Sequence, residues 1–175
     1  MLKNKKGFTL IELLIVIAII AIIAAVVIVA LDPATRFKDA RDAVRASDVE
    51  QLANAIKVDQ VDNGGTYHAN ITGLTSGSVY VIVNGATMVA GCDDNNASCD
   101  TNVTADTSCA DLSFLTTEGY LGELPVSPAG AVTWDDGSVA GNEGTGYTIS
   151  YNSTTGTVTL RSCESENTTE ISVAQ

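Results

Sequence analysis

One acidic side chain at the start of an apolar stretch is the first candidate for chemistry. Glu12 lies four residues after Phe8, and residues 13–31 contain no polar side chain. An acid inside a membrane-spanning helix costs about 2.5–3.5 kcal/mol, so a partner is expected. Cleavage after Gly7 would create one, because Phe8 would then carry a free, positively charged amine. In a low dielectric such an acid–amine pair is much stronger than in water.

The segment that carries Glu12 is long enough to cross a bilayer. As a helix, residues 8–31 would extend about 36 Å, against a bilayer core of about 30 Å. The segment is apolar on every side, which excludes a helix with one face on a soluble core. Lys3, Lys5 and Lys6 precede it, so the N-terminus is expected to stay cytoplasmic and the rest to be exported. A cleaved signal peptide has a shorter apolar region. An ordinary signal anchor remains the alternative, but it leaves Glu12 unexplained.

The residues around Glu12 form a specific pattern. Residues 5–14 read KKGFTLIELL, and this sequence resembles the class III leader and N-terminal helix of bacterial type IV prepilins and type II secretion pseudopilins. The resemblance implies cleavage between Gly7 and Phe8, and N-methylation of Phe8, by a membrane prepilin peptidase. It also implies that Glu12 pairs with the Phe8 amine of a neighbouring subunit during assembly. Loss of residues 1–7, with their three lysines, would take the formal charge from −12 to −15.

A second helical segment is predicted after the first. Asp32 suits an N-cap and Pro33 the first helical position, so helix is expected to be interrupted there and to restart. Residues 63–65, Asn-Gly-Gly, should end it. One apolar stripe is expected to face a folded body, with charged side chains on the other faces. The stripe comprises Phe37, Ala40, Val44, Val49, Leu52, Ala53 and Ile56, and the charged set comprises Arg36, Lys38, Arg41, Asp42, Arg45 and Asp48.

Charge and composition narrow the function classes. The chain has 9 basic and 21 acidic residues, and residues 62–175 carry 14 acids and one base. Such a body would repel phosphates, so the arginines and Lys38 of the second helix are expected to balance nearby acids rather than bind DNA. A single histidine and 5% aromatic residues disfavour a His-rich metal centre or an aromatic cofactor pocket. No catalytic motif or phosphate loop appears. We therefore expect no enzyme activity, no cofactor and no nucleic-acid partner.

The remaining residues are predicted to form a β-rich head. Two hairpins are expected, one around Asn84-Gly85 and one around the turn at residues 152–156. A short helix within residues 109–120, stopped by Gly119, and an extended segment at 121–128 complete the prediction. The predicted strands are residues 79–83, 86–89, 131–134, 147–151 and 157–161.

These elements give an α+β fold that resembles the pilin plan. A long N-terminal α-helix, with a transmembrane half and a packed half, would lie against an antiparallel β-sheet head. The expected segments are a leader at residues 1–7, a transmembrane or filament-core helix at 8–31, an amphipathic second half at 32–63 and an extracytoplasmic head at 64–175.

Four cysteines lie in the exported part of the chain: Cys92, Cys99, Cys109 and Cys163. Disulfides persist outside the cytoplasm, and four cysteines allow three pairings. Cys92 with Cys99 would close a small loop, while Cys109 with Cys163 would tie the last hairpin to the body. The second pairing resembles the C-terminal disulfide of many pilins. A zinc site is the rival, but there is no C-x-x-C pair.

One acidic loop raises a calcium alternative. Asp94, Asn96 and Asp100 alternate like the first ligands of a calcium loop, but Cys99 stands where glycine is required and no glutamate closes the loop. These residues are weak candidates for binding Ca²⁺, and a solvated acidic turn is the favoured interpretation.

The sequence as a whole favours a structural subunit that polymerises through its N-terminal helix into a type IV pilus or pilus-like filament. By resemblance, its partners are other copies of itself, a prepilin peptidase, and an assembly platform with its ATPase. It would begin as a single-pass protein of the bacterial cytoplasmic membrane and end in an extracellular or periplasmic filament. The alternatives are a pseudopilin of a type II secretion system and, in another class, a membrane-tethered extracellular binding module in which Glu12 is incidental.

Overall fold

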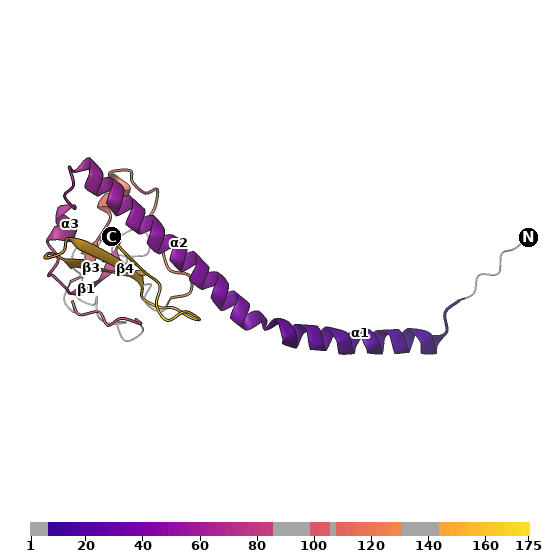
Figure 1. The fold of residues 1–175 in the computed structure, drawn as a ribbon. Coiled ribbons are helices and arrows are strands. Elements are labelled where there is room, and N and C mark those ends of the chain that lie inside the picture. Colours follow the sequence, from indigo (N-terminus) through magenta and orange to yellow (C-terminus); the bar gives the residue numbers. More distant parts are fainter. Residues whose placement is uncertain (1–6, 86–98, 106–107, 131–143) are drawn as a thin grey trace, which may run out of the picture. The chain divides into compact units, whose positions relative to one another are not determined.

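The computed structural model describes residues 7–85, 99–105, 108–130 and 144–175. The chain divides into two compact units, one ending at Phe37 and the other running from Lys38 to Gln175 (Figure 1). The first unit contains helix α1, and the second contains most of helix α2 and a five-stranded sheet.

Helix α1, Leu10–Leu31, has no buried residue. Its side chains are apolar on all sides, which excludes the one-sided pattern of a helix lying on a soluble core. Within the described residues, one helical stretch is long and apolar enough to cross a membrane, and it begins with α1. The observed helix ends at Leu31, as predicted, but begins at Leu10 rather than at Phe8.

The predicted interruption at Asp32 is confirmed. Asp32 has a φ of 38°, in the left-handed region, and helix α2, Pro33–Asp62, starts directly after it. The Thr35 hydroxyl donates to the Asp32 carboxylate at 2.6 Å, and the Arg36 N–H donates to the Asp32 carbonyl at 3.3 Å. These two bonds link Asp32 to the first turn of α2, where Pro33 has no N–H to donate.

The end of α2 is also where the sequence predicts it. Gly64 and Gly65 have φ values of 68° and 93°, which a residue with a Cβ adopts only under strain. The Gly65 N–H donates to the Gln60 carbonyl at 2.8 Å and so closes the last turn.

The sheet has the strand order β2-β1-β3-β4-β5. All neighbours are antiparallel except β1 and β2, which are parallel. The predicted hairpin at 147–161 is confirmed as β3 and β4, whereas β2 and β5 were not predicted. The strands are β1 Val79–Val83, β2 Ala110–Asp111, β3 Gly144–Asn152, β4 Thr157–Ser162 and β5 Ser172–Ala174.

Two short helices complete the described elements: α3, Ala69–Thr72, and α4, Phe114–Thr117. The helix predicted within 109–120 is shorter than expected, because its first residues form β2. It ends just before Gly119, whose φ is 86°. The strands predicted at 86–89 and 131–134 lie outside the described residues.

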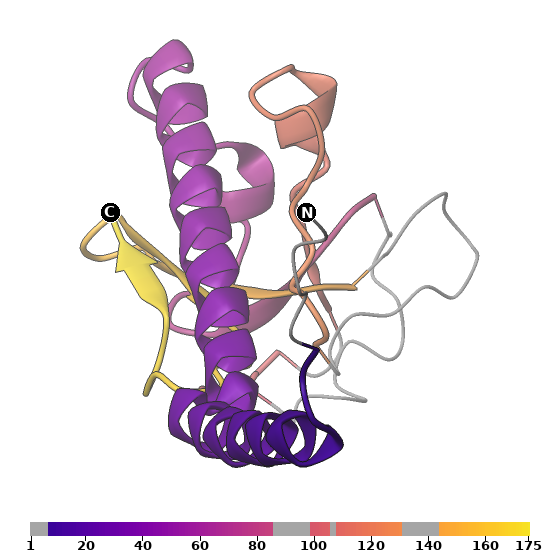
Figure 2. The ribbon, with the colours of Figure 1, turned by 90° about the vertical axis from the view of Figure 1, so that its right-hand side faces the viewer.

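Alternation along β1 gives the sheet two different faces. Tyr80 and Ile82 join the main core with Leu52 and Ile56 of α2, as the crossing of α2 over the sheet in Figure 2 illustrates. Val79 and Val81 point the other way. They belong to a second buried cluster with Cys99, Val103 and Cys163.

The predicted apolar stripe of α2 is correct only in its second part. Val49, Leu52, Ala53 and Ile56 are buried, but the three earlier members of the stripe are exposed. Two residues expected on the outer faces, Asp42 and Arg45, are buried instead. The burial of these two residues has a physical reason: polar groups of the head lie opposite residues 41–48 of α2 and pair with them. The three exposed members are Phe37, Ala40 and Val44.

Candidate functional site

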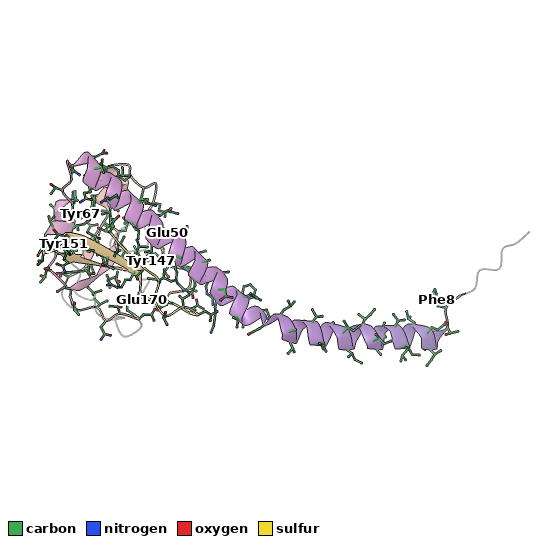
Figure 3. All side chains as sticks on the ribbon, viewed as in Figure 1. Phe8, Glu50, Tyr67, Tyr147, Tyr151 and Glu170 are labelled. Atoms are coloured by element: carbon green, nitrogen blue, oxygen red, sulfur yellow. A yellow bond between two sulfur atoms is a disulfide. The ribbon has the colours of Figure 1, made fainter. Side chains whose placement is uncertain are left out.

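The residues before α1 are extended and open to solvent. Phe8 is 92% exposed, and a Cβ built on Gly7 would meet no atom within 4 Å. The Gly7–Phe8 peptide therefore lies in a non-helical, accessible stretch just before the helix, where Figure 3 labels Phe8. A protease needs such access to the backbone, because helical hydrogen bonds would otherwise have to be broken first.

Glu12 is held by Thr9 at the first turn of α1. The Thr9 N–H and hydroxyl donate to Glu12 Oε2 at 2.8 and 2.7 Å, and the Glu12 N–H donates to Thr9 Oγ1 at 3.3 Å. This reciprocal arrangement is a capping box. Thr9 was missed as a site residue, although the spacing Thr-x-x-Glu before an apolar run is the signal that finds it.

One oxygen of Glu12 is left for another donor. The bonds that reach its carboxylate within the described part of the chain all use Oε2. A cation can therefore approach Oε1 without displacing Thr9. Among the described residues of a single precursor copy, the structure brings Glu12 to Thr9 but to no cation.

The disulfide pattern differs from the pairing expected by resemblance. Cys99 is bonded to Cys163, so the expected pairs Cys92–Cys99 and Cys109–Cys163 are wrong. The strand order gives the reason. Cys109 precedes β2 at one edge of the sheet, whereas Cys163 follows β4, and β1 and β3 lie between them. Strands are about 4.8 Å apart, so this separation exceeds the reach of a disulfide.

The other two cysteines have separate outcomes. Cys109 is also disulfide-bonded. Cys92 lies outside the described residues. The Cys99–Cys163 bond spans 64 residues of sequence, and closing a loop of that length stabilises the fold by about 4 kcal/mol on the chain-entropy estimate.

Asp100 is the one calcium candidate among the described residues, and its contacts do not support a Ca²⁺ site. The Asp100 carboxylate accepts a hydrogen bond from the Ser165 N–H at 2.9 Å, and the Asp100 N–H donates to the Cys163 carbonyl at 2.7 Å. Asp94 and Asn96 lie outside the described residues. In the described ranges, no group of three or more His, Cys, Asp or Glu residues could hold a metal ion.

Two basic residues of α2 form an ionic cluster with the C-terminal loop, buried at its centre and partly exposed at its edge. Arg45 is 0% exposed, and its Nη1 donates to Asp42 Oδ1 at 2.8 Å and to Glu166 Oε1 at 3.0 Å. Arg41 Nε donates to Glu166 Oε1 at 2.6 Å. These four residues are called the ionic cluster below. Arg41 and Arg45, two of the four cations at residues 36–45, therefore pair with acids of the same chain.

Further donors and acceptors complete the ionic cluster. Arg45 Nε donates to Ser127 Oγ at 3.0 Å, and Nη2 donates to the Pro128 carbonyl at 2.7 Å. The Asp42 carboxylate accepts from the backbone N–H groups of Glu166 and Asn167. The two buried members, Asp42 and Arg45, therefore both have partners, as a low-dielectric site requires.

Both acids of the cluster titrate below their usual range. The hydrogen bond from Arg41, opposed by desolvation and helped by Arg45, lowers the pKa of Glu166 to about 2. Burial opposes ionisation of Asp42, but the amide N–H groups of Asn167 and Glu166 and the Arg45 guanidinium together lower its pKa. Both side chains are thus anionic at neutral pH.

A tyrosine extends this polar contact along α2. The Tyr147 hydroxyl donates to Asp48 Oδ2 at 2.6 Å, and the ring is 0% exposed (Figure 3). Burial, followed by the hydrogen bond to Asp48, raises the pKa of Tyr147. The phenol is therefore protonated throughout the physiological range and acts as a permanent donor.

Comparison with known proteins bears on the N-terminal residues. The family model described as the prokaryotic N-terminal methylation motif matches residues 2–28. No curated protein and no solved structure matches the chain. The matched residues include Gly7, Phe8, Thr9 and Glu12, whose geometry is given above. The chain thus carries the N-terminal methylation motif of a class III prepilin leader, typical of type IV pilins and pseudopilins, on a pilin-like α+β fold.

Proposed function

We propose that this chain is a subunit that polymerises into a type IV pilus or pilus-like filament. Its leader is removed between Gly7 and Phe8, Phe8 is N-methylated, and Glu12 binds the Phe8 amine of a neighbouring copy. The observation that carries the proposal is α1 itself, a 22-residue apolar helix with no buried side chain and one acid in its first turn.

An uncovered helix of this kind needs an apolar environment on all sides. A bilayer provides one, and a bundle of identical helices provides another. Lipid and neighbouring helices are about equally apolar, so hydrophobicity gives little preference for the bundle. A directional polar contact is therefore needed to set the register between copies.

Glu12 is suited to supply that contact. Its Oε2 accepts hydrogen bonds from Thr9. No described residue donates to its Oε1, which can therefore accept from a second copy. The Phe8 ammonium exists only after cleavage, so the pairing couples processing to assembly. The Thr9 bonds fix the carboxylate near the end of the helix, where an incoming amine reaches it first.

The proposed partners and location follow from the motif. A membrane prepilin peptidase would cut at the cytoplasmic face, where the three lysines of residues 1–7 hold the N-terminus. An assembly platform and a cytoplasmic ATPase would supply the work of extraction from the bilayer. The head would lie outside the cytoplasm, consistent with its disulfides.

Glu12→Gln is the test, because it keeps the side-chain shape and removes the charge. We expect filaments in sheared or periplasmic fractions to be lost while the membrane pool of the subunit stays at its wild-type level. Glu50→Gln, at an exposed position of α2, is the matched control and should assemble normally. Normal filaments from Glu12→Gln would contradict the proposal. Long surface fibres in the wild type support a pilus, and a short periplasmic filament supports the pseudopilin alternative.

A further inference from the structure

The contact between α2 and the rest of the head changes chemistry part-way along the helix. In residues 41–48 the contacts are hydrogen bonds and ion pairs; this is the polar half. In residues 49–56 the buried side chains are all apolar; this is the apolar half. The polar half comprises Arg41, Asp42, Arg45 and Asp48, and the apolar half comprises Val49, Leu52, Ala53, Ala55 and Ile56.

The two halves differ in what separation from the head would cost. If the polar half opens, water can hydrate the Arg45 guanidinium, both acids of the ionic cluster and the loop amides. Buried ion pairs are close to balanced against full hydration of both partners. If the apolar half opens, Leu52 and Ile56, both 0% exposed, enter water with no compensating bond. Opening is therefore easier at the polar half.

The loop opposite the polar half is fixed to the sheet without any help from α2. Cys163 is bonded to Cys99, and the Asp100 N–H donates to the Cys163 carbonyl at 2.7 Å. The Ser165 N–H donates to Asp100 Oδ2 at 2.9 Å, and Arg161 Nε lies 3.4 Å from Glu170 Oε1. If the contact opens, the helix moves and the loop stays.

We propose that residues 38–48 form a releasable segment of α2, which separates from the head at the polar half while the apolar half keeps the helix anchored. The sheet, the disulfide and the main core stay intact in the released state. This inference concerns the head alone, so it goes beyond the proposed polymerisation and is tested independently of it.

Backbone amides report the opening directly. The N–H groups of Glu166, Asn167 and Thr168 donate to the Asp42 carboxylate on α2, so they lose their acceptor when the segment leaves. Once detached, residues 38–48 lose their packing against the head, which supplies most of a helix's stability in a protein, and their amides exchange as well. Local opening of this kind appears as faster hydrogen exchange in one contiguous region.

The experiment is hydrogen–deuterium exchange of the full chain in detergent micelles, read by mass spectrometry of peptides. We expect peptides over residues 38–48 and 164–168 to exchange roughly tenfold or more faster than peptides over 49–59, after correction for intrinsic rates. Equal protection along residues 38–59 in the wild type would overturn the proposal, and this comparison needs no variant to fold.

Three variants sharpen the result. Glu166→Gln should speed exchange of residues 38–48 and 164–168 by roughly tenfold, with 49–59 and strands β3 and β4 unchanged. Glu123→Gln, an exposed acid outside the cluster, should change neither region. Leu52→Ala, in the apolar half, should speed exchange of residues 38–48 and 49–59 together. If Glu166→Gln speeds exchange of residues 38–48 and 49–59 equally, or speeds neither, α2 is held as one unit and the proposal is wrong.

Discussion

Replacing Arg45 with methionine removes the central cation of the ionic cluster while keeping an unbranched side chain. Asp42, only 4% exposed, and Glu166 would lose their shared guanidinium. Removing one partner of a buried ion pair costs about 3–5 kcal/mol. Asp42 keeps its bonds from the backbone N–H groups of Glu166 and Asn167, so we expect the lower end, about 3 kcal/mol.

A loss of that size is large against a typical total stability of about 5–15 kcal/mol. It corresponds to a Tm lower by roughly 10 °C. With a urea m-value of about 2 kcal/mol/M, the midpoint should fall by about 1.5 M. The assay is urea unfolding of the full chain in micelles, followed by near-ultraviolet circular dichroism, since guanidinium chloride would screen the ion pairs being tested.

Two further variants separate charge from packing. Lys38→Met, at an exposed position of α2, is the matched control and should change stability by less than about 0.5 kcal/mol. Adding Asp42→Asn to Arg45→Met should recover part of the loss, because it removes an uncompensated buried charge. If Arg45→Met is no worse than Lys38→Met, or if the double variant shows simple additivity, the reasoning about the ionic cluster is refuted.

Three further predictions follow from the same contacts. The pKa of Glu166 is about 2 in the folded chain, below its value in the unfolded chain, so ionised Glu166 stabilises the fold and stability should fall as pH drops from about 5 to 2. Glu166→Gln should flatten this pH dependence, and an unchanged acid profile in that variant would refute the prediction. Converting Cys99 and Cys163 to serine should lower the free energy of unfolding by about 2–4 kcal/mol, measured under non-reducing conditions. Tyr147→Phe leaves Asp48 without its phenolic donor and should cost about 1–3 kcal/mol in the same urea assay, whereas a neutral result would show that water replaces the hydroxyl.

Local sequence signals predicted the elements that depend on neighbouring residues. The apolar run fixes α1, Asp32-Pro33 marks the interruption, and Gly64-Gly65 marks the end of α2. The hairpin of β3 and β4 follows from alternation around a short turn. Each signal acts within a few residues, so no knowledge of the tertiary fold was needed.

Contacts between distant residues could not be predicted in this way. Arg45 looks like a surface cation on its helix, and its burial depends on Glu166, 121 residues away. The disulfide partner of Cys163 depends on the strand order, which places Cys109 at the far edge of the sheet. Strand β5 has three residues and is stabilised by pairing with β4 rather than by its own sequence pattern.

At the N-terminus, sequence and structure contribute different parts of the proposed site. Gly7, Phe8 and Glu12 come from the sequence pattern alone. The structure adds the Thr9 capping box, which satisfies one oxygen of Glu12 and leaves the other accessible. Neither a single sequence nor a single copy of the chain contains the neighbouring amine, because that group belongs to another, processed subunit.

Mass spectrometry of the mature protein tests the central claim most directly. The account predicts a chain that begins at Phe8, lacks residues 1–7 and carries one additional methyl group on its terminal nitrogen. Mature protein isolated from cells with Met1 to Gly7 still attached, or with an unmodified cut elsewhere, would contradict it.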